Sequence, residues 1–145
     1  MTQPSQNYAN HKQIVPIYHY VLLPLSLITA ILSIVYAVLG FAEHGALASI
    51  LLLLLGIVVL IGSATGRMYA VKVQDRLIRA EEDLRHFKLT GRWIDPRLTM
   101  KQLIALRFAS DAEFPSLCEK AIEENMAPDM IKKAVKNWRA DHYRV

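Results

Sequence analysis

The residues that could take part in catalysis are few and lie far apart in the sequence. The single cysteine, Cys118, falls on the apolar side of a predicted helix, where a buried thiol is expected rather than a nucleophile. The other candidates for an acid–base site are His19, His86, Asp95 and Glu113. No phosphate-binding loop, paired-glycine fingerprint, nucleophile elbow or metal-ligand spacing accompanies them. We therefore expect neither an enzyme nor a metal or cofactor site.

A cluster of basic residues near the C-terminus could instead bind an anionic surface. A helix that begins at Pro128 would place four of them on one face: Lys132, Lys133, Lys136 and Arg139. This face could contact anionic lipid headgroups or, less readily, nucleic acid, and it could also simply be solvated. The net charge of +4 is too small to choose among these.

Two long charge-free blocks must position these groups. The first spans residues 17–42 and the second residues 46–66, and neither contains Asp, Glu, Lys or Arg. Each supplies the ~20 apolar residues that cross a bilayer core of about 30 Å. Only residues 43–45 connect the blocks, so we predict a transmembrane helical hairpin. Pro24 predicts a kink or a late helix start in the first block.

The distribution of positive charge predicts the orientation of the hairpin. The 43–45 connection has no Lys or Arg, whereas six follow the second block: Arg67, Lys72, Arg76, Arg79, Arg85 and Lys88. The positive-inside rule therefore places both termini, including the polar segment 1–16, in the cytoplasm. A cleaved signal peptide is the competing interpretation, but the first block is longer than a signal core of ~7–15 residues.

Small residues in the hairpin predict close helix packing. Gly62 and Gly66 form a Gly-x-x-x-Gly motif on the second helix, and the four-residue spacing places both on one face. The first helix has a comparable stripe of Thr29, Ser33 and Ala37. We expect these stripes to pack the two helices against each other, and contact between protomers is the alternative.

The second helix is predicted to continue beyond the membrane as a cytoplasmic stalk over residues 67–90. Its apolar residues recur at steps of three and four, which is typical of one continuous helix face. This seam consists of Ala70, Val73, Leu77, Ala80, Leu84 and Phe87. It could form a parallel coiled coil between protomers or receive the chain's own C-terminal helices, and its short length favours the second arrangement. Glu81 and Arg85, at i and i+4, are expected to pair.

Residues 91–145 are predicted to form a small bundle of three short helices. Two capping boxes, Thr99–Gln102 and Ser110–Glu113, open the first two helices, and Pro128 begins the third. The first helix should reach about Ala109, and the third should bury Met130 among other apolar residues. No strand is required anywhere, so the predicted fold class is all-α.

Three short motifs are distinctive: Gln6–His11 (QNYANH), Leu106–Asp111 (LRFASD) and Lys136–His142 (KNWRADH). Together they resemble a family of small bacterial two-span membrane proteins that is known only as a domain of unknown function. The resemblance implies a bacterial inner-membrane protein and supplies no activity, ligand or catalytic residue. The Gln6–His11 segment itself could be a docking segment or an unstructured leader.

These features favour a non-enzymatic membrane protein that acts as an adaptor, as an accessory subunit of a membrane complex, or as a homo-oligomer. Its expected partners are the lipid bilayer and either a second copy or another membrane protein. The alternative is a membrane-tethered protein that binds anionic lipid or nucleic acid through the basic face of the last helix, with nucleic acid the less favoured ligand.

Overall fold

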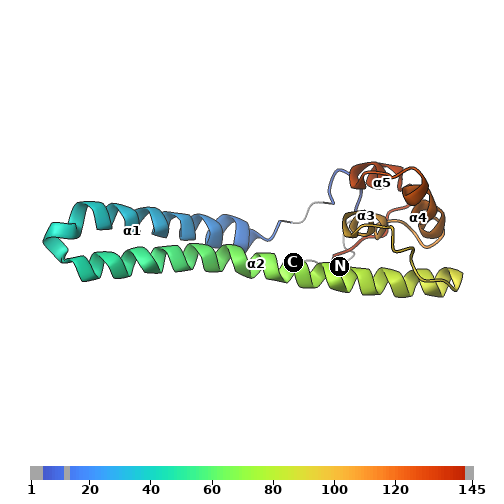
Figure 1. Ribbon diagram of the computed structural model, residues 1–145. Helices are drawn as coiled ribbons and strands as arrows, with labels where there is room; N and C mark the ends of the chain where they lie inside the picture. The colour runs from blue at the N-terminus through green and yellow to red at the C-terminus, as the bar shows by residue number, and fades with distance from the viewer. Residues whose placement is uncertain (1–4, 12–13, 143–145) are drawn as a thin grey trace. The chain divides into compact units, whose positions relative to one another are not determined.

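The fold is all-helical, as predicted (Figure 1). The computed structural model describes residues 5–11 and 14–142, and for residues 41–44 it describes the backbone only. The elements are η1 (Ile17–Leu22), α1 (Leu23–His44), α2 (Ala46–Thr90), α3 (Met100–Leu106), α4 (Phe114–Glu123) and α5 (Pro128–Ala134). Within the described residues, the one β feature is an isolated bridge between Ala109 and Trp138.

The chain divides into two compact units, which we describe separately. The hairpin unit comprises residues 14–71, and the C-terminal unit combines residues 72–142 with the N-terminal segment 5–11. The helix α2 contributes residues to both units, because it covers the residues predicted for the second span and for the stalk. It ends before Gly91, whose φ of +73° is the left-handed conformation that commonly terminates helices.

In the hairpin unit, two helices are long and apolar enough to cross a membrane. The first apolar stretch is Ile17–Gly40, with a mean hydropathy of 2.4, and the second lies in α2, with a mean hydropathy of 2.8. Pro24 explains the start of α1, because its ring nitrogen has no hydrogen to donate to the preceding turn. That turn is the π-helix η1, in which the Leu23 N–H donates to the Tyr18 carbonyl. The α-helix thus begins late, at Leu23, although the helical segment as a whole begins at Ile17.

Small residues bring α1 and α2 together. Ser26, Ala30 and Ser33 are buried on α1, at steps of four and three, and the Ser63 hydroxyl of α2 donates to Ser26 Oγ at 3.2 Å. A Cβ at Gly56 would lie 3.3 Å from the Ala30 Cα and closer still to the Ser33 side chain. The two backbones therefore approach where Gly56 has no side chain.

The predicted role of Gly62 and Gly66 in packing the hairpin is wrong. A Cβ at either glycine would meet nothing within 4 Å. Both lie about a quarter turn of helix away from the row that contains Gly56 and Ser63, because each residue advances the helix by about 100°. Of the stripe predicted on the first helix, Ser33 is buried, whereas Thr29 and Ala37 are only partly buried. Contact of Gly62 and Gly66 with a second protomer stays a prediction.

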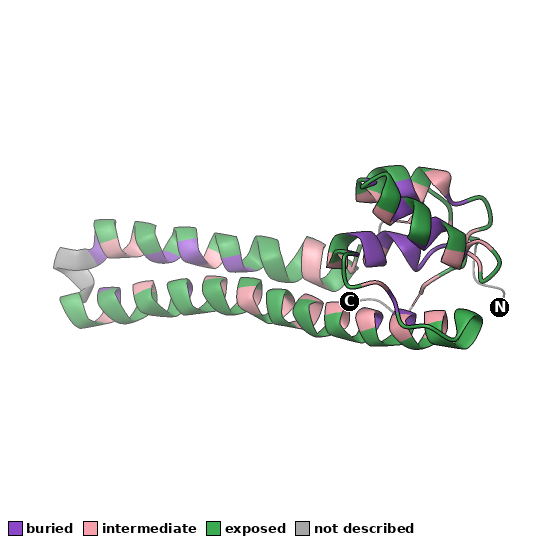
Figure 2. Cartoon of the chain, turned by 45° about the vertical axis from the view of Figure 1, so that its right-hand side comes forward, coloured by how far each residue is buried: buried purple, intermediate pink, exposed green. Residues whose placement is uncertain are grey.

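In the C-terminal unit, the core forms around α3 (Figure 2). Leu103 and Leu106 of α3, Phe114 of α4 and Ile131 of α5 are fully buried. The capping box at Thr99 is confirmed, since Thr99 and Gln102 each bond the other's backbone N–H. The Gln102 amide group also donates to the Met126 carbonyl at 3.0 Å. This bond ties the start of α3 to the connection between α4 and α5.

Two predicted helices are shorter than the apolar pattern indicates. The helix α3 ends at Leu106 rather than near Ala109, because Ala109 pairs with Trp138 in the isolated bridge. The helix α5 ends at Ala134, and Met130, predicted to be buried, is 56% exposed. In both cases a backbone pairing between distant segments replaces the last helical turn.

The predicted packing of the C-terminal helices on the α2 seam is also wrong. Val73, Leu77 and Leu84 are all more than half exposed, and Ala80 is exposed as well. The buried positions of α2 in this unit are Ile78 and Glu82. The chain therefore places a different and more polar face of α2 against the segments that follow α3 and α5.

The stability of the hairpin unit should depend on the absence of a side chain at Gly56. We expect Gly56→Val to lower the stability of the hairpin unit by about 1–3 kcal/mol, because the added side chain must displace the α1 backbone. Gly62→Val is the matched control, since it makes the same change on the same helix where no atom lies nearby. Thermal unfolding of the full chain in detergent, followed by circular dichroism, measures the difference. Equal melting temperatures for the two variants would contradict the packing.

Candidate functional site

The most elaborate polar arrangement in the C-terminal unit is built on Glu82 of α2. Its side chain is 6% exposed, and a carboxylate at that depth is costly unless it is paired. Arg85, one helical turn later, places Nη1 2.9 Å from Glu82 Oε2. Arg139 places its own Nη1 3.8 Å from Oε1 of the same carboxylate. Glu82 is thus held between two guanidinium groups, one from α2 and one from the segment after α5.

Arg85 connects α2 to the loop between α3 and α4. Its guanidinium donates to Asp111 Oδ1 at 2.7 Å and to the Ala109 carbonyl at 2.7 Å. It also lies over the Phe114 ring, 4.3 Å from the centroid. The negative face of an aromatic ring attracts a cation, so this contact is favourable. The predicted pairing of Arg85 with Glu81 is wrong, because Glu82, Asp111 and Ala109 occupy its donors. The hydrogen bond from Arg85 also lowers the pKa of Asp111.

Glu113 holds the segment after α5 in place. Its carboxylate accepts hydrogen bonds from the backbone N–H groups of Asn137 at 3.0 Å, Lys136 at 3.2 Å and Ser110 at 3.2 Å. The Ser110 bond is half of the predicted capping box, although α4 itself begins at Phe114. Burial raises the pKa of Glu113, but these hydrogen bonds outweigh it and leave the pKa below its ordinary value of 4.5.

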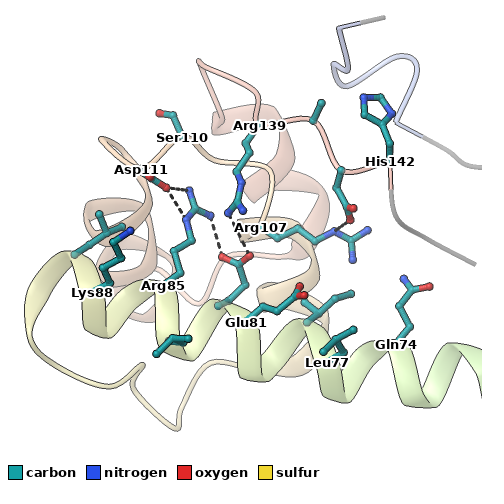
Figure 3. Close-up of a pocket in the computed structure, with 16 residues that line it drawn as sticks. Gln74, Leu77, Glu81, Arg85, Lys88, Arg107, Ser110, Asp111, Arg139 and His142 are labelled. Atoms are coloured by element: carbon teal, nitrogen blue, oxygen red, sulfur yellow. Dashed lines mark hydrogen bonds and ion pairs between the residues drawn. The ribbon is translucent and has the colours of Figure 1, made fainter. Parts of the chain in front are cut away.

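An open groove of about 950 Å³ runs between α2 and the loops that follow α3 and α5 (Figure 3). Its charged lining consists of four acidic and four basic side chains: Glu81, Glu82, Asp111, Asp141, Arg85, Lys88, Arg107 and Arg139. Besides the pairs at Glu82, Arg107 Nε lies 3.1 Å from Asp141 Oδ2. The groove is therefore balanced in charge, and its ion pairs join segments of the chain to one another.

Each of the four candidates for acid–base chemistry bonds other groups within its own unit. His19 lies in the hairpin unit, where its ring bonds the Val15 backbone. In the C-terminal unit, His86 Nδ1 lies 2.8 Å from the Arg92 carbonyl oxygen. Asp95 pairs with Arg97, whose hydrogen bond lowers the Asp95 pKa to about 2. Glu113 binds backbone groups instead, and among the described residues no three His, Cys, Asp or Glu side chains are grouped as for a metal.

Cys118 is buried in the core, as predicted. Only 3% of the residue is exposed, and burial raises its thiol pKa to about 12. The reactive thiolate is therefore scarce near neutral pH. Cys118 packs as a small apolar side chain.

The four basic residues predicted on the last helix do not share one helical face. Lys132 and Lys133 are on α5, but Lys136 and Arg139 lie beyond its end at Ala134. Lys133 pairs with Asp129 at 3.1 Å, and Arg139 pairs with Glu82. The bridge between Ala109 and Trp138 is the physical reason, since it extends the chain where the helix was expected to continue.

The N-terminal segment is docked on the C-terminal unit. The Gln6 side chain accepts from the Asp141 N–H at 2.8 Å and donates to the Asp141 carbonyl at 3.2 Å. The Tyr8 hydroxyl donates to Asp129 at 2.8 Å. The His11 ring lies 5.9 Å from the ring centroids of Phe108 and of Trp138. Of the two interpretations of this motif, the docking segment is confirmed and the unstructured leader is wrong.

The three distinctive motifs meet in this docking site. Gln6–His11 contacts Phe108 of the second motif and Trp138 and Asp141 of the third. The sequence signalled each motif separately, and it predicted that parts of the second and third motifs continue the first and third helices of the bundle. It carried no signal that joins residues 135 positions apart.

The stability of the C-terminal unit should depend on Glu82. We expect Glu82→Ala to cost about 3 kcal/mol, because it leaves two guanidinium groups without their shared carboxylate. Glu81→Ala is the matched control, because Glu81 lines the same groove but is exposed, and it should change stability by less than about 0.5 kcal/mol. Urea unfolding of the full chain in detergent, followed by the fluorescence of Trp93 and Trp138, reports the difference. A similar loss for both variants would contradict the bridging role of Glu82.

The lowered pKa of Glu113 predicts acid sensitivity of the same unit. Its folded-state pKa lies below the ordinary value of 4.5, so its stabilising contribution is present above pH 4.5. That contribution is lost as the pH falls through the folded-state pKa. We expect Glu113→Gln to be less stable at neutral pH and to lose less stability on acidification. Urea unfolding at about pH 7 and about pH 3 tests this, and parallel pH profiles for parent and variant would refute it.

A model of the family described as "Family of unknown function (DUF6526)" matches residues 1–145. No curated protein matches the chain, and no solved structure matches it. The match confirms the predicted resemblance to an uncharacterised family over the full sequence. The bacterial and membrane character that the resemblance implied stays a prediction.

Proposed function

Since the chain belongs to the family of unknown function DUF6526, we propose a role for it from its own residues. It acts as a membrane-anchored, non-enzymatic adaptor or accessory subunit. The hairpin unit crosses a bacterial inner membrane, and the C-terminal unit binds another protein chain, or a second copy, on the cytoplasmic side.

The exposed apolar surface of the hairpin unit supports membrane insertion, and it is the observation that carries the proposal. Only 17% of the residues in the most apolar window of the first helix are buried, and 11% in the second. Core helices of a soluble protein would bury such side chains. The 24 residues of Ile17–Gly40 extend about 36 Å at about 1.5 Å per residue, enough for a hydrocarbon core of about 30 Å. Lipid would cover this surface and leave the helical backbone bonds intact.

The charges that flank the hairpin support the cytoplasmic placement of both termini. The 43–45 connection has no Lys or Arg, whereas Arg67 follows the second apolar block directly. Within the hairpin unit the Arg67 guanidinium lies over the Tyr18 ring, 5.0 Å from its centroid. Tyrosine and arginine side chains both favour the membrane–water interface. The pair therefore suits the cytoplasmic boundary of the bilayer.

Two features of the C-terminal unit favour binding over catalysis. The groove uses its charges to join segments of the chain, with Arg85 and Arg139 both engaged by Glu82. The α2 helix meanwhile exposes Val73, Leu77 and Leu84 in a row. Exposed aliphatic rows outside a membrane segment are typical of protein contact surfaces. The alternative, binding of anionic lipid or nucleic acid, has less support because Lys133 and Arg139 are already paired.

Chemical labelling of single cysteines tests the anchor. Ala46→Cys lies at the start of α2, and Lys101→Cys lies in the C-terminal unit. We expect a membrane-impermeant maleimide to label Ala46→Cys in intact bacterial cells and Lys101→Cys only after permeabilisation. The parent chain is the control, since the pKa of its buried Cys118 is raised to about 12 and the thiol should label slowly. Reversed labelling, or release of the protein by alkaline carbonate, would contradict insertion or its orientation.

The mass of the purified protein tests whether the chain binds a second copy or another protein. The full chain, purified in mild detergent at its natural level of expression, should have a mass above that of one chain plus detergent. A strictly monomeric species without a bound protein would contradict the adaptor role, whatever the labelling result.

A further inference from the structure

In the C-terminal unit α2 has two faces with different uses. Ile78, Glu82 and Arg85 form the face that packs on the chain's own loops and helices. The seam residues that belong to this unit lie about 150° around the helix from that face, by the 100° step per residue. They are Val73, Leu77, Ala80, Leu84 and Phe87. All of them are exposed, Phe87 at 42% and Val73 at 67%. Leu77 and Leu84 also line the groove, and the Phe87 ring stacks on Trp93 with centroids 4.8 Å apart, but the exposed surface of the seam is not covered by a C-terminal helix of the same chain.

We propose that this seam is the interface of a homodimer, in which α2 helices of two copies form a parallel coiled coil between Val73 and Lys88. The proposal rests on the proposed function and names a second copy as the partner. Two hairpins with the same orientation in one membrane send their α2 helices out in the same direction, which makes pairing parallel. The seam spacing of four, three, four and three matches alternating core positions of a heptad.

The charges beside the seam support a second copy as the occupant. With Leu77 and Leu84 at the first heptad position, Arg76 and Asp83 precede the core, and Glu81 and Lys88 follow it. In a parallel dimer each preceding residue meets the residue five positions later on the partner. Arg76 would then meet Glu81 of the second copy, and Asp83 would meet Lys88. Both contacts join opposite charges, and the two-fold symmetry doubles them.

The same charges specify the register. A shift of one heptad would bring Arg76 opposite Lys88 and Asp83 opposite Glu81, so each pair would be of like charge. Such repulsion disfavours the shifted dimer. Within residues 5–11 and 14–142, no ion pair engages any of these four side chains. The neighbouring Glu82, by contrast, is turned inward to Arg85.

The dimer must be studied in the whole chain. The seam covers little more than two heptads and contains Ala80 at its centre, so an isolated peptide would associate weakly. Anchoring both copies in one membrane raises their effective concentration and converts a weak contact into a populated one. Native membranes that contain the full-length protein are therefore the material for the experiment.

Disulfide formation tests the interface. Facing core positions of a parallel coiled coil lie within the ~4.4–6.8 Å Cα separation of a disulfide. We expect Ala80→Cys to give a disulfide dimer on mild oxidation in native membranes. Arg79→Cys is the matched control, one residue away and about 100° around the helix. Its dimer yield should be at least about tenfold lower, because its Cα atoms lie outside that range.

Charge exchange tests the register. Asp83→Lys places a lysine opposite Lys88 of the second copy and should lower the yield of the Ala80→Cys dimer about fivefold. Adding Lys88→Asp restores opposite charges and should restore the yield. Arg79→Asp is the control for a charge reversal on α2 away from the seam, and it should leave the yield unchanged.

The outcomes separate this inference from the proposed function. Strong linking at residue 80 with weak linking at residue 79, together with restoration by the double charge exchange, supports the dimer. Equal linking at both positions, no linking in correctly inserted protein, or linking to a different protein overturns the dimer and leaves the membrane adaptor intact. Failure of the chain to insert in the membrane overturns the proposed function and, with it, the parallel arrangement.

Discussion

The carboxylate of Glu82 lies inside the C-terminal unit, where an unpaired charge would be costly. Arg85 neutralises it from 2.9 Å and extends its remaining N–H groups to Asp111 and the Ala109 carbonyl. A planar guanidinium can satisfy these acceptors only if the loop after α3 lies against α2. That loop supplies Ala109 for the bridge with Trp138. The course of the chain after α5 therefore depends on an ion pair formed within α2.

The docked N-terminal segment completes this arrangement. Three short helices bury little apolar surface on their own, and the unit enlarges its interior with residues from both ends of the sequence. His11 adds a ring beside Phe108 and Trp138, and Gln6 pairs with the backbone of Asp141. The residues just beyond the ends of α3 and α5 are thus the ones that join the N-terminal segment to the bundle.

A polar interior face on α2 also bears on the proposed dimer. Ile78 and Glu82 are buried and Arg85 bonds the segment after α3, whereas Val73, Leu77 and Leu84 are exposed. Because α2 contacts the rest of its own chain largely through ion pairs, its aliphatic row stays available for contact with a second chain. Leu77 and Leu84 of the seam also line the groove, so the ion pairs that join segments of one chain lie beside the row that is proposed to join two chains.

The sequence alone determined which segments are helical, because those signals are local, whereas the pairing of Ala109 with Trp138 decided where α3 and α5 end. The apolar length of the two blocks, the capping box at Thr99 and the stop at Gly91 each act within a few residues. Tertiary structure decided which faces of those helices are buried. Apolar periodicity predicted that Leu77 is buried, and the Gly-x-x-x-Gly motif predicted that Gly62 packs against the first helix. Instead Glu82 is buried in the C-terminal unit, and Gly56 lies where the two hairpin helices approach. The physical reason is that a buried ion pair and a close backbone approach depend on partners far away in the sequence, which periodicity within one helix does not record.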